Sequence, residues 1–200
     1  MVYLKNQYKQ RGFSLFIVMV IMIIIALIVL VTSQTANTEM RMSTNEADRK
    51  FAITLAEIGL LQAETEIKRW AEDENQEIKF STDCTNGLCA PAKDTYTDSS
   101  DVQFKFVSPL DSNVVAWKRC QTNLNKACEN GTDKSILDTG CKAIDKCKMT
   151  ADGKANYIIE YLGKKLDGSG KSNFFRVTSR AHGNNNDTVV TLQTYLELEY

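Results

Sequence analysis

Apolar residues are concentrated in one uninterrupted run close to the start of the chain. The run covers residues 13–31 and contains a single polar residue, Ser14, with no charge, glycine or proline. A helix of this length rises roughly 28 Å, which matches a bilayer core of about 30 Å. The sequence therefore predicts a membrane-spanning helix, because a buried core helix would not be so long and so uniformly apolar.

The charges on either side of this run predict its orientation. Lys5, Lys9 and Arg11 precede it, and the first charge after it is Glu39. The positive-inside rule then places the N-terminus in the cytoplasm and the rest of the chain outside. A cleaved secretory signal peptide is the competing interpretation, but it needs a shorter apolar region followed by a small-residue cleavage site.

The helix is predicted to continue beyond the membrane, over residues 32–76. This stretch contains no proline and only one glycine, Gly59, so one helix of about 90 Å would run from residue 13 to about residue 72. Its second half has an apolar face with helical spacing, formed by Phe51, Ala52, Leu55, Ala56, Gly59, Leu60, Ala63, Ile67 and Trp70. That face predicts burial against the chain's own domain or, as the alternative, contact with a partner helix.

The remainder, residues 77–200, has the composition of loops and short strands. Residues 81–101 and 121–155 are rich in Asp, Asn, Ser, Thr, Gly and Lys, as loops are. Alternation and β-branched content predict strands at 102–107, 114–119, 157–162, 174–180 and 188–198. Turn residues at 167–170 and 184–187 would join the last three into an antiparallel meander.

The last of these strands has a clear inner and outer face. Its alternation turns Val190, Leu192, Leu196 and Leu198 towards the apolar helix face and leaves Thr191, Gln193 and Glu197 in solvent. Helix-on-sheet packing is the common two-layer solution for such a pattern. The predicted fold is therefore α+β, a long N-terminal helix on a C-terminal antiparallel sheet.

Six cysteines lie beyond the apolar run, in a compartment where disulfides persist. They are Cys84, Cys89, Cys120, Cys128, Cys141 and Cys147. Three bridges could form in 15 ways. One alternative pairs neighbours as Cys84–Cys89, Cys120–Cys128 and Cys141–Cys147, which would staple three separate loops. A zinc site is the rival interpretation, but there is no C-x-x-C and the only histidine, His182, lies outside the cluster.

Charge and motifs narrow the possible functions further. The 24 basic residues nearly balance the 25 acidic ones, whereas nucleic-acid-binding proteins have a basic excess. Phosphate-binding loops and nucleophile motifs are missing from the sequence, so no enzyme, cofactor or metal is predicted. The acidic residues of the long loop fit no EF-hand spacing; they are Asp133, Asp138, Asp145 and Asp152.

The junction between the basic segment and the apolar run is distinctive. Gln10-Arg11-Gly12 is followed directly by Phe13-Ser14-Leu15. This junction resembles the class III signal of type IV prepilins, in which a prepilin peptidase cuts after the glycine and methylates the new N-terminal residue. The resemblance implies cleavage between Gly12 and Phe13, removal of a leader over residues 1–12, and an N-methylated Phe13.

The next segment sharpens the resemblance. Asn45, Asp48 and Arg49 form an N-x-x-D-R motif ahead of an Ala-Glu-rich helix that contains Glu57. This resembles the minor pilins of the PilX/PilK type, and residues 157–163 and 175–181 resemble that family's closing strands. The resemblance covers roughly residues 10–72 and 156–196.

One departure from the major pilins has a functional implication. Major pilins carry a glutamate at the fifth mature position, where this chain has Ile17. That glutamate is thought to pair with the N-terminal amine of a neighbouring subunit, because a buried ammonium is costly without a partner. A subunit without the carboxylate fits best where no subunit lies ahead of it, at the tip.

The resemblance implies a structural subunit with defined partners. It would be a minor pilin that helps to initiate pilus assembly, at or near the tip, with other minor pilins, the major pilin and a tip adhesin. Prepilin peptidase and the inner-membrane assembly platform would act on it. It would lie in the bacterial inner membrane before assembly and in the extracellular pilus afterwards.

Two alternatives stay open from the sequence. One is a K-like tip pseudopilin of a type II secretion system, although such subunits carry a large inserted helical domain for which 200 residues leave little room. The other is a single-pass inner-membrane protein with a periplasmic enzyme domain. The missing catalytic motifs and the Gly12-Phe13 junction weigh against it.

Overall fold

The computed structural model describes residues 13–72, 77–92, 106–107, 113–128, 133–167 and 170–199. The chain forms two compact units, Met1–Ala47 and Asp48–Tyr200. A single helix, α1 (Phe13–Glu72), contributes residues to both. The predicted continuous helix is therefore confirmed.

In the first unit, α1 presents the apolar run to its surroundings. The large apolar side chains of residues 13–31 are exposed, from 40% at Val20 to 74% at Phe13. By length and composition this helix could cross a membrane. Beyond the run, threonine hydroxyls donate to the carbonyl oxygen four residues earlier, over 2.8–3.1 Å, at Thr32, Thr35 and Thr38. Their polar groups are thus satisfied within the helix, which continues without a break.

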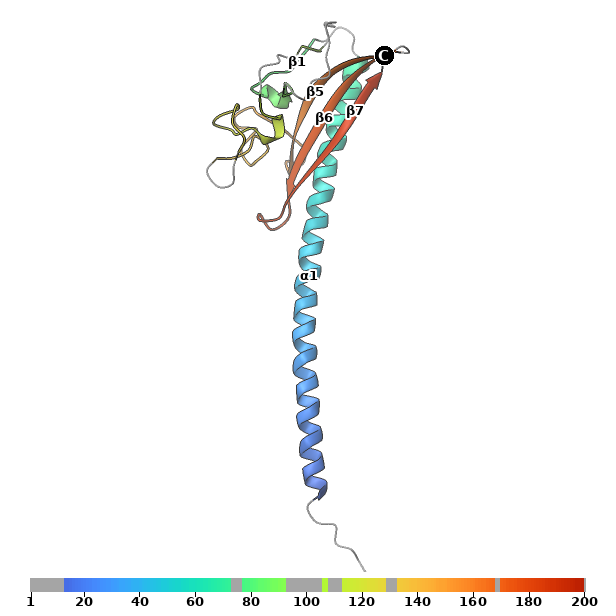
Figure 1. The fold of residues 1–200 in the computed structure, drawn as a ribbon, viewed down its shortest axis with the longest axis vertical. Coiled ribbons are helices and arrows are strands. Elements are labelled where there is room, and N and C mark those ends of the chain that lie inside the picture. The colour runs from blue at the N-terminus through green and yellow to red at the C-terminus, as the bar shows by residue number, and fades with distance from the viewer. Residues whose placement is uncertain are drawn as a thin grey trace, which may run out of the picture. The chain divides into compact units, whose positions relative to one another are not determined.

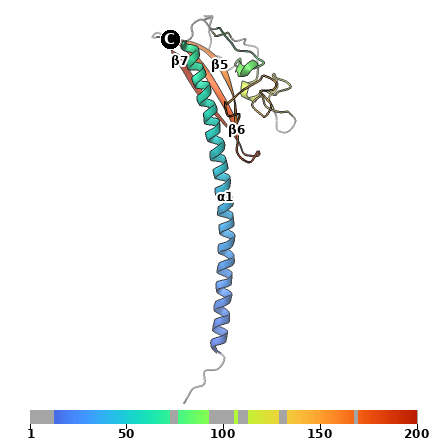
Figure 2. The same ribbon diagram turned by 180° about the vertical axis from the view of Figure 1, so that it is seen from behind.

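The second unit contains the predicted meander. Strands β5 (Ala155–Asp167), β6 (Gly170–His182) and β7 (Val189–Glu199) pair antiparallel in that order. They lie side by side in Figure 1, and Figure 2 shows the C-terminal part of α1 in front of them. The three strands are confirmed. Strands β5 and β6 are longer than predicted, β7 has the predicted length, and β5 has a bulge between Tyr161 and Gly163.

Short strands that the sequence did not predict extend this sheet beyond β5. Strand β2 (Leu88–Cys89) pairs parallel with β5, and β4 (Lys148–Met149) pairs antiparallel with it. The sheet is therefore mostly, not wholly, antiparallel. Separately, β1 (Ile78–Lys79) pairs parallel with β3 (Phe106–Val107). Of the strand predicted over 102–107, only residues 106–107 lie within the described part of the chain.

The prediction of a strand over residues 114–119 is wrong. A 3₁₀ helix, η2 (Ala116–Lys118), occupies this segment, and the Lys118 N–H donates to the Val115 carbonyl at 3.0 Å. The physical reason is the next residue, Arg119, whose Nε donates to the Val114 carbonyl at 2.9 Å. This bond turns the Arg119 side chain back towards its own segment, where it is fully buried. In a strand the side chain would instead point straight out from one face of the sheet. A second 3₁₀ helix, η1 (Thr85–Gly87), lies inside the Cys84–Cys89 loop.

The apolar face of α1 packs on the chain's own sheet. Its buried residues are Ala52, Leu55, Ala56, Gly59, Ala63, Ile67 and Trp70. The core-face interpretation is thereby confirmed over the partner-helix alternative for these residues. The approach is closest at Gly59, where a Cβ would overlap the Ser179 hydroxyl and lie 3.2 Å from the Ser179 Cβ. A side chain at position 59 would therefore have to displace the Ser179 side chain.

An aromatic cluster closes the core near the C-terminal end of α1. Trp70 meets Phe80 edge-on with ring centroids 6.0 Å apart, and Phe175 and Tyr161 lie 5.4 Å apart. Along β7 the side chains alternate between half-buried and exposed over the whole strand. The predicted inner and outer faces of β7 are thereby confirmed.

Candidate functional site

The face of the sheet away from α1 is covered by a set of loops. These loops, residues 81–92, 113–128 and 133–153, are called the loop subdomain below. Tyr157, Ile159 and Tyr161 of β5 join the core beneath α1, whereas Ile158 packs among residues of the loops. The loop subdomain thus adds a third layer to the second unit.

Three disulfides staple the loop subdomain. They link Cys84 to Cys89, Cys120 to Cys128 and Cys141 to Cys147, with Cα–Cα distances of 4.1, 5.1 and 5.4 Å. The structure thus forms the neighbour pairing, one of the alternatives from the sequence. Because each bridge closes a short loop, chain entropy gives each only a modest stabilisation. Something further has to hold the three loops together.

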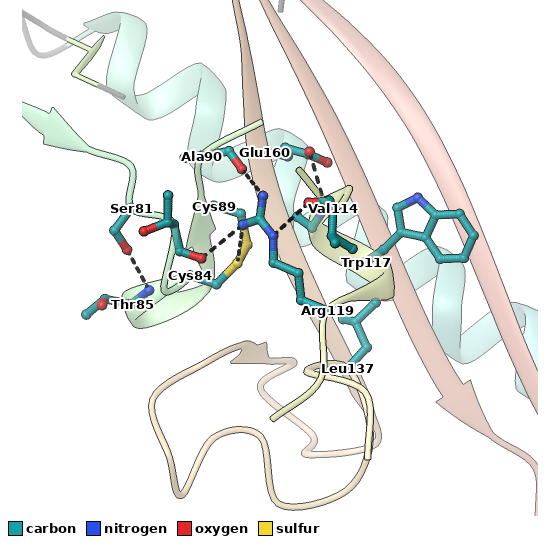
Figure 3. The surroundings of a disulfide bond; sticks show 12 residues. Ser81, Cys84, Thr85, Cys89, Ala90, Val114, Trp117, Arg119, Leu137 and Glu160 are labelled. Carbon is teal, nitrogen blue, oxygen red and sulfur yellow. Dashed lines mark hydrogen bonds between the residues drawn. A yellow bond between two sulfur atoms is a disulfide. The ribbon is translucent and has the colours of Figure 1, made fainter. Parts of the chain in front are cut away.

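Arg119, next to Cys120, joins the first of these loops to the segment that leads into the second (Figure 3). Its side chain is fully buried. Besides the bond to Val114, Nη1 donates to the Thr82 carbonyl at 3.1 Å and lies 3.4 Å from the Cys84 Sγ, and Nη2 donates to the Ala90 carbonyl at 2.7 Å. One guanidinium therefore ties both ends of the Cys84–Cys89 loop to the segment before η2.

The buried charge of Arg119 is balanced from a distance. Burial lowers the pKa of the Arg119 guanidinium, and the nearby carboxylate of Glu160 acts against that shift. Sequence reasoning did not single out Arg119. The signal that could have found it is a pair of basic residues, Lys118 and Arg119, between an apolar stretch and a cysteine.

A buried ion pair links the sheet to the same loops. Glu160 of β5 and Arg176 of β6 are register partners. Arg176 donates through Nε at 2.8 Å and Nη2 at 2.6 Å to Glu160 Oε2, and the Ala116 N–H donates to Oε1 at 3.4 Å. Glu160 has no exposed surface and Arg176 is 6% exposed. Burial raises the pKa of the Glu160 carboxyl, while Arg176 and Arg119 act in the opposite direction.

Further polar contacts fasten the loop subdomain to the sheet. Arg180 of β6 forms an ion pair with Asp138. Asn156 of β5 donates to the Leu137 carbonyl at 3.1 Å. These contacts lie on the same face as the Glu160–Arg176 pair, so the loops are attached through polar anchors as well as through apolar packing.

Asp48, from the N-x-x-D-R motif, fastens the turn between β6 and β7 to α1. Its Oδ1 accepts from the Asn184 N–H at 2.6 Å and the Asn185 N–H at 3.4 Å. A Cβ at Gly183 would lie 2.5–2.7 Å from the carboxylate, so a side chain there would have to displace the carboxylate. Hydrogen bonds from the Thr188 side chain and from the two backbone amides lower the pKa of Asp48.

The Asp48 contact should be sensitive to acid. Because the folded pKa of Asp48 lies below its ordinary value of 3.8, its contribution is fully present above pH 3.8 and is lost as the pH falls through the folded pKa. We expect the protection factor of the Asn184 amide, its exchange rate relative to the intrinsic rate at the same pH, to fall several-fold across that range. Hydrogen exchange measured from pH 5 downwards checks this.

A matched pair of variants isolates the Asp48 carboxylate. Asp48→Asn should show the low protection already at neutral pH and no acid transition, whereas Asp187→Asn, exposed in the same turn, should behave as the wild type. An unchanged acid transition in Asp48→Asn would contradict the assignment.

The other residues singled out from the sequence are dispersed. Gly12 lies outside the described residues, and Phe13 and Ile17 are exposed on α1, at 74% and 43%. In the first unit Asn45 is exposed, and in the second Arg49 and Glu57 are exposed. Of the motif residues, only Asp48 has a side-chain contact within the second unit that we can assign.

Two remaining groups have structural explanations. His182 is half-buried at the end of β6, and its Nδ1 lies 3.1 Å from the Asn186 carbonyl. Cys120, Cys128 and Asp133 lie close enough to suggest a metal site. However, the two sulfurs form a disulfide and so cannot bind a metal as thiolates.

Comparison with known proteins gives two family matches. Residues 85–197 match the model described as type IV pilus assembly protein PilX, C-terminal, and residues 11–61 match the PilX N-terminal model. The first match covers more than half of the chain and includes β2, β4, β5, β6 and most of β7. The second begins beside the Gly12-Phe13 junction and includes Asp48. Neither a curated protein nor a solved structure matches the chain.

Proposed function

This chain belongs to the PilX family of type IV pilus assembly proteins, and from that premise we propose that it is a minor pilin. In this role it is a structural subunit, not an enzyme, that helps to initiate pilus assembly. The observation that carries the proposal is the combination of a long exposed apolar helix with an α+β unit whose core lies under the same helix. A subunit built this way can be stored in a membrane and then packed helix against helix in a filament.

The proposal includes a defined processing step. Residues 1–12 form a leader that prepilin peptidase removes, and Phe13 becomes the methylated N-terminus. Residues 13–31 cross the inner membrane with the N-terminus in the cytoplasm. The segment 32–76 contains the rest of α1, which ends at Glu72, and residues 77–200 form the head. Support comes from the basic residues before the run and from the Gly12-Phe13 junction itself.

The proposed position is the tip of the pilus. Ile17 offers no carboxylate to a subunit ahead of it. The N-terminal ammonium of such a subunit would therefore be buried without a negatively charged partner. The proposed partners are therefore other minor pilins and a tip adhesin in front and the major pilin behind. The inner-membrane assembly platform would act on the subunit before it joins the filament.

Mass spectrometry of the mature protein tests the processing step. We expect a chain that begins at N-methylated Phe13 in cells with active prepilin peptidase. The same chain in cells without the peptidase is the matched control and should begin at Met1. A Met1 start in both strains would refute the pilin assignment.

Restoring the missing carboxylate tests the tip position. Ile17→Glu should let a subunit pack ahead, so we expect the protein to spread along the pilus instead of remaining at one end. Immunogold labelling of sheared pili measures this distribution. Val18→Glu adds the same charge to a different helix face and should not produce the spread. An unchanged distribution for Ile17→Glu would contradict the tip argument.

A further inference from the structure

The outer edge of β7 lacks the usual protection of an edge strand. Within the described chain β7 pairs only with β6, and this pairing runs from Val189 to Glu199 without a bulge. Natural edge strands are typically short, bulged or carry lysine, proline or inward charges. Residues 189–199 contain no lysine, proline or glycine. This edge therefore offers a long, regular row of backbone donors and acceptors.

The inner face of β7 is only partly covered by α1. A helix about 10 Å wide covers about two strands spaced by about 4.8 Å, and the fully buried rows belong to β5 and β6. The inner β7 side chains remain half-buried, namely Val190, Leu192, Leu196 and Leu198. One more strand beside β7 would bury this row of side chains and would also form hydrogen bonds with the backbone N–H and C=O groups of the β7 edge.

The outer face of this edge is acidic near its C-terminal end. Glu197 and Glu199 are exposed there, on the face of β7 that points away from α1.

We propose that the free edge of β7 binds an extended strand of another pilus protein. Only a strand can pair with the whole backbone row, and its apolar side chains would continue the half-buried layer over α1. Basic side chains on the partner would face the exposed carboxylates of Glu197 and Glu199. This proposal rests on the proposed function only in that the partner is a pilus protein.

Site-specific photocrosslinking in the full-length chain tests the proposal. A photoreactive phenylalanine analogue would be placed in turn at Thr191, Gln193 and Tyr195, on the exposed face of β7. Adjacent strands bring opposite side chains within about 5.5 Å. We therefore expect crosslinks to three partner residues spaced two apart, in a segment of alternating apolar and polar residues. The same analogue at Ile144, an exposed residue of the loop subdomain, is the control and should not label that segment.

Charge reversal supplies a second readout. Glu197→Lys combined with Glu199→Lys should lower the crosslink yield by at least about threefold, whereas Lys126→Glu in the loop subdomain should not change it. Crosslinks to a helix, to scattered positions, or to β7 of a second copy would overturn the proposal. Normal incorporation into pili without any crosslink from β7 would also overturn the strand proposal. That outcome would leave the proposed minor-pilin function intact. A chain that never enters pili would instead refute the proposed function.

Discussion

Replacing Arg176 by methionine should lower the free energy of unfolding by about 3–5 kcal/mol at neutral pH. The substitution leaves Glu160 without exposed surface and without its 2.6 and 2.8 Å donors. A buried, ionised carboxylate without a paired cation is far less stable than the same group in water. Denaturant unfolding of the full-length chain in detergent, followed by tryptophan fluorescence, measures the change.

The pH dependence of this loss separates charge from packing. Burial raises the folded pKa of Glu160 above 4.5, so its contribution is fully present below pH 4.5 and is lost as the pH rises through the folded pKa. Removing Arg176, which lowers that pKa, should raise it further. The destabilisation in Arg176→Met should therefore be much smaller at pH 4 than at pH 7. A loss that does not change with pH would show that packing, not the unpaired charge, is responsible.

The double variant is the matched control for the pair. Glu160→Met combined with Arg176→Met removes both charges, and such replacements are often neutral or stabilising. We expect it to be closer in stability to the wild type than Arg176→Met is. A double variant as unstable as the single one would contradict the ion-pair explanation.

Local periodicity explains why α1 and the meander could be predicted. The apolar face from Phe51 to Trp70 repeats with the helical period, and the side chains of β7 alternate strictly. Each pattern can therefore be recognised from residues that are close together in the sequence. Strands β2 and β4 could not be predicted in this way, because each has only two residues and pairs with β5 about 70 and 8 residues away along the chain. Their pairing depends on tertiary contacts.

The candidate site was harder to predict than the fold, because its contacts are non-local. Asp48 was singled out by its motif, but the turn it fastens begins 136 residues later at Asn184. Glu160 stands in a run of apolar residues that is buried on both faces, which was an available sign of a paired buried charge. Arg119 gave the weakest signal, since its partners are backbone carbonyls that no side-chain pattern reveals.

Arg119 is also where we expect the second large effect. Arg119→Met would leave the carbonyls of Thr82, Val114 and Ala90 without their donor. Each buried carbonyl that loses its partner costs about 1–3 kcal/mol, so the opening of this loop should become easier by about 3 kcal/mol. Arg119→Lys should recover only part of this, because one ammonium lacks the planar fork that reaches three acceptors.

Reduction of the neighbouring disulfide measures this opening directly. Cys84 and Cys89 have no exposed surface, so a soluble thiol reaches them only after the loop opens. At 1.4 kcal/mol per tenfold change, about 3 kcal/mol should make reduction of Cys84–Cys89 about a hundredfold faster in Arg119→Met. Reduction of Cys141–Cys147 serves as the internal control, and Lys142→Ala, at an exposed lysine of the same loops, as the control variant. The Arg119 guanidinium contacts Cys84 and neither Cys141 nor Cys147. Equal acceleration at both measured disulfides would therefore mean global unfolding, and no acceleration at either would mean that other contacts hold the loop closed.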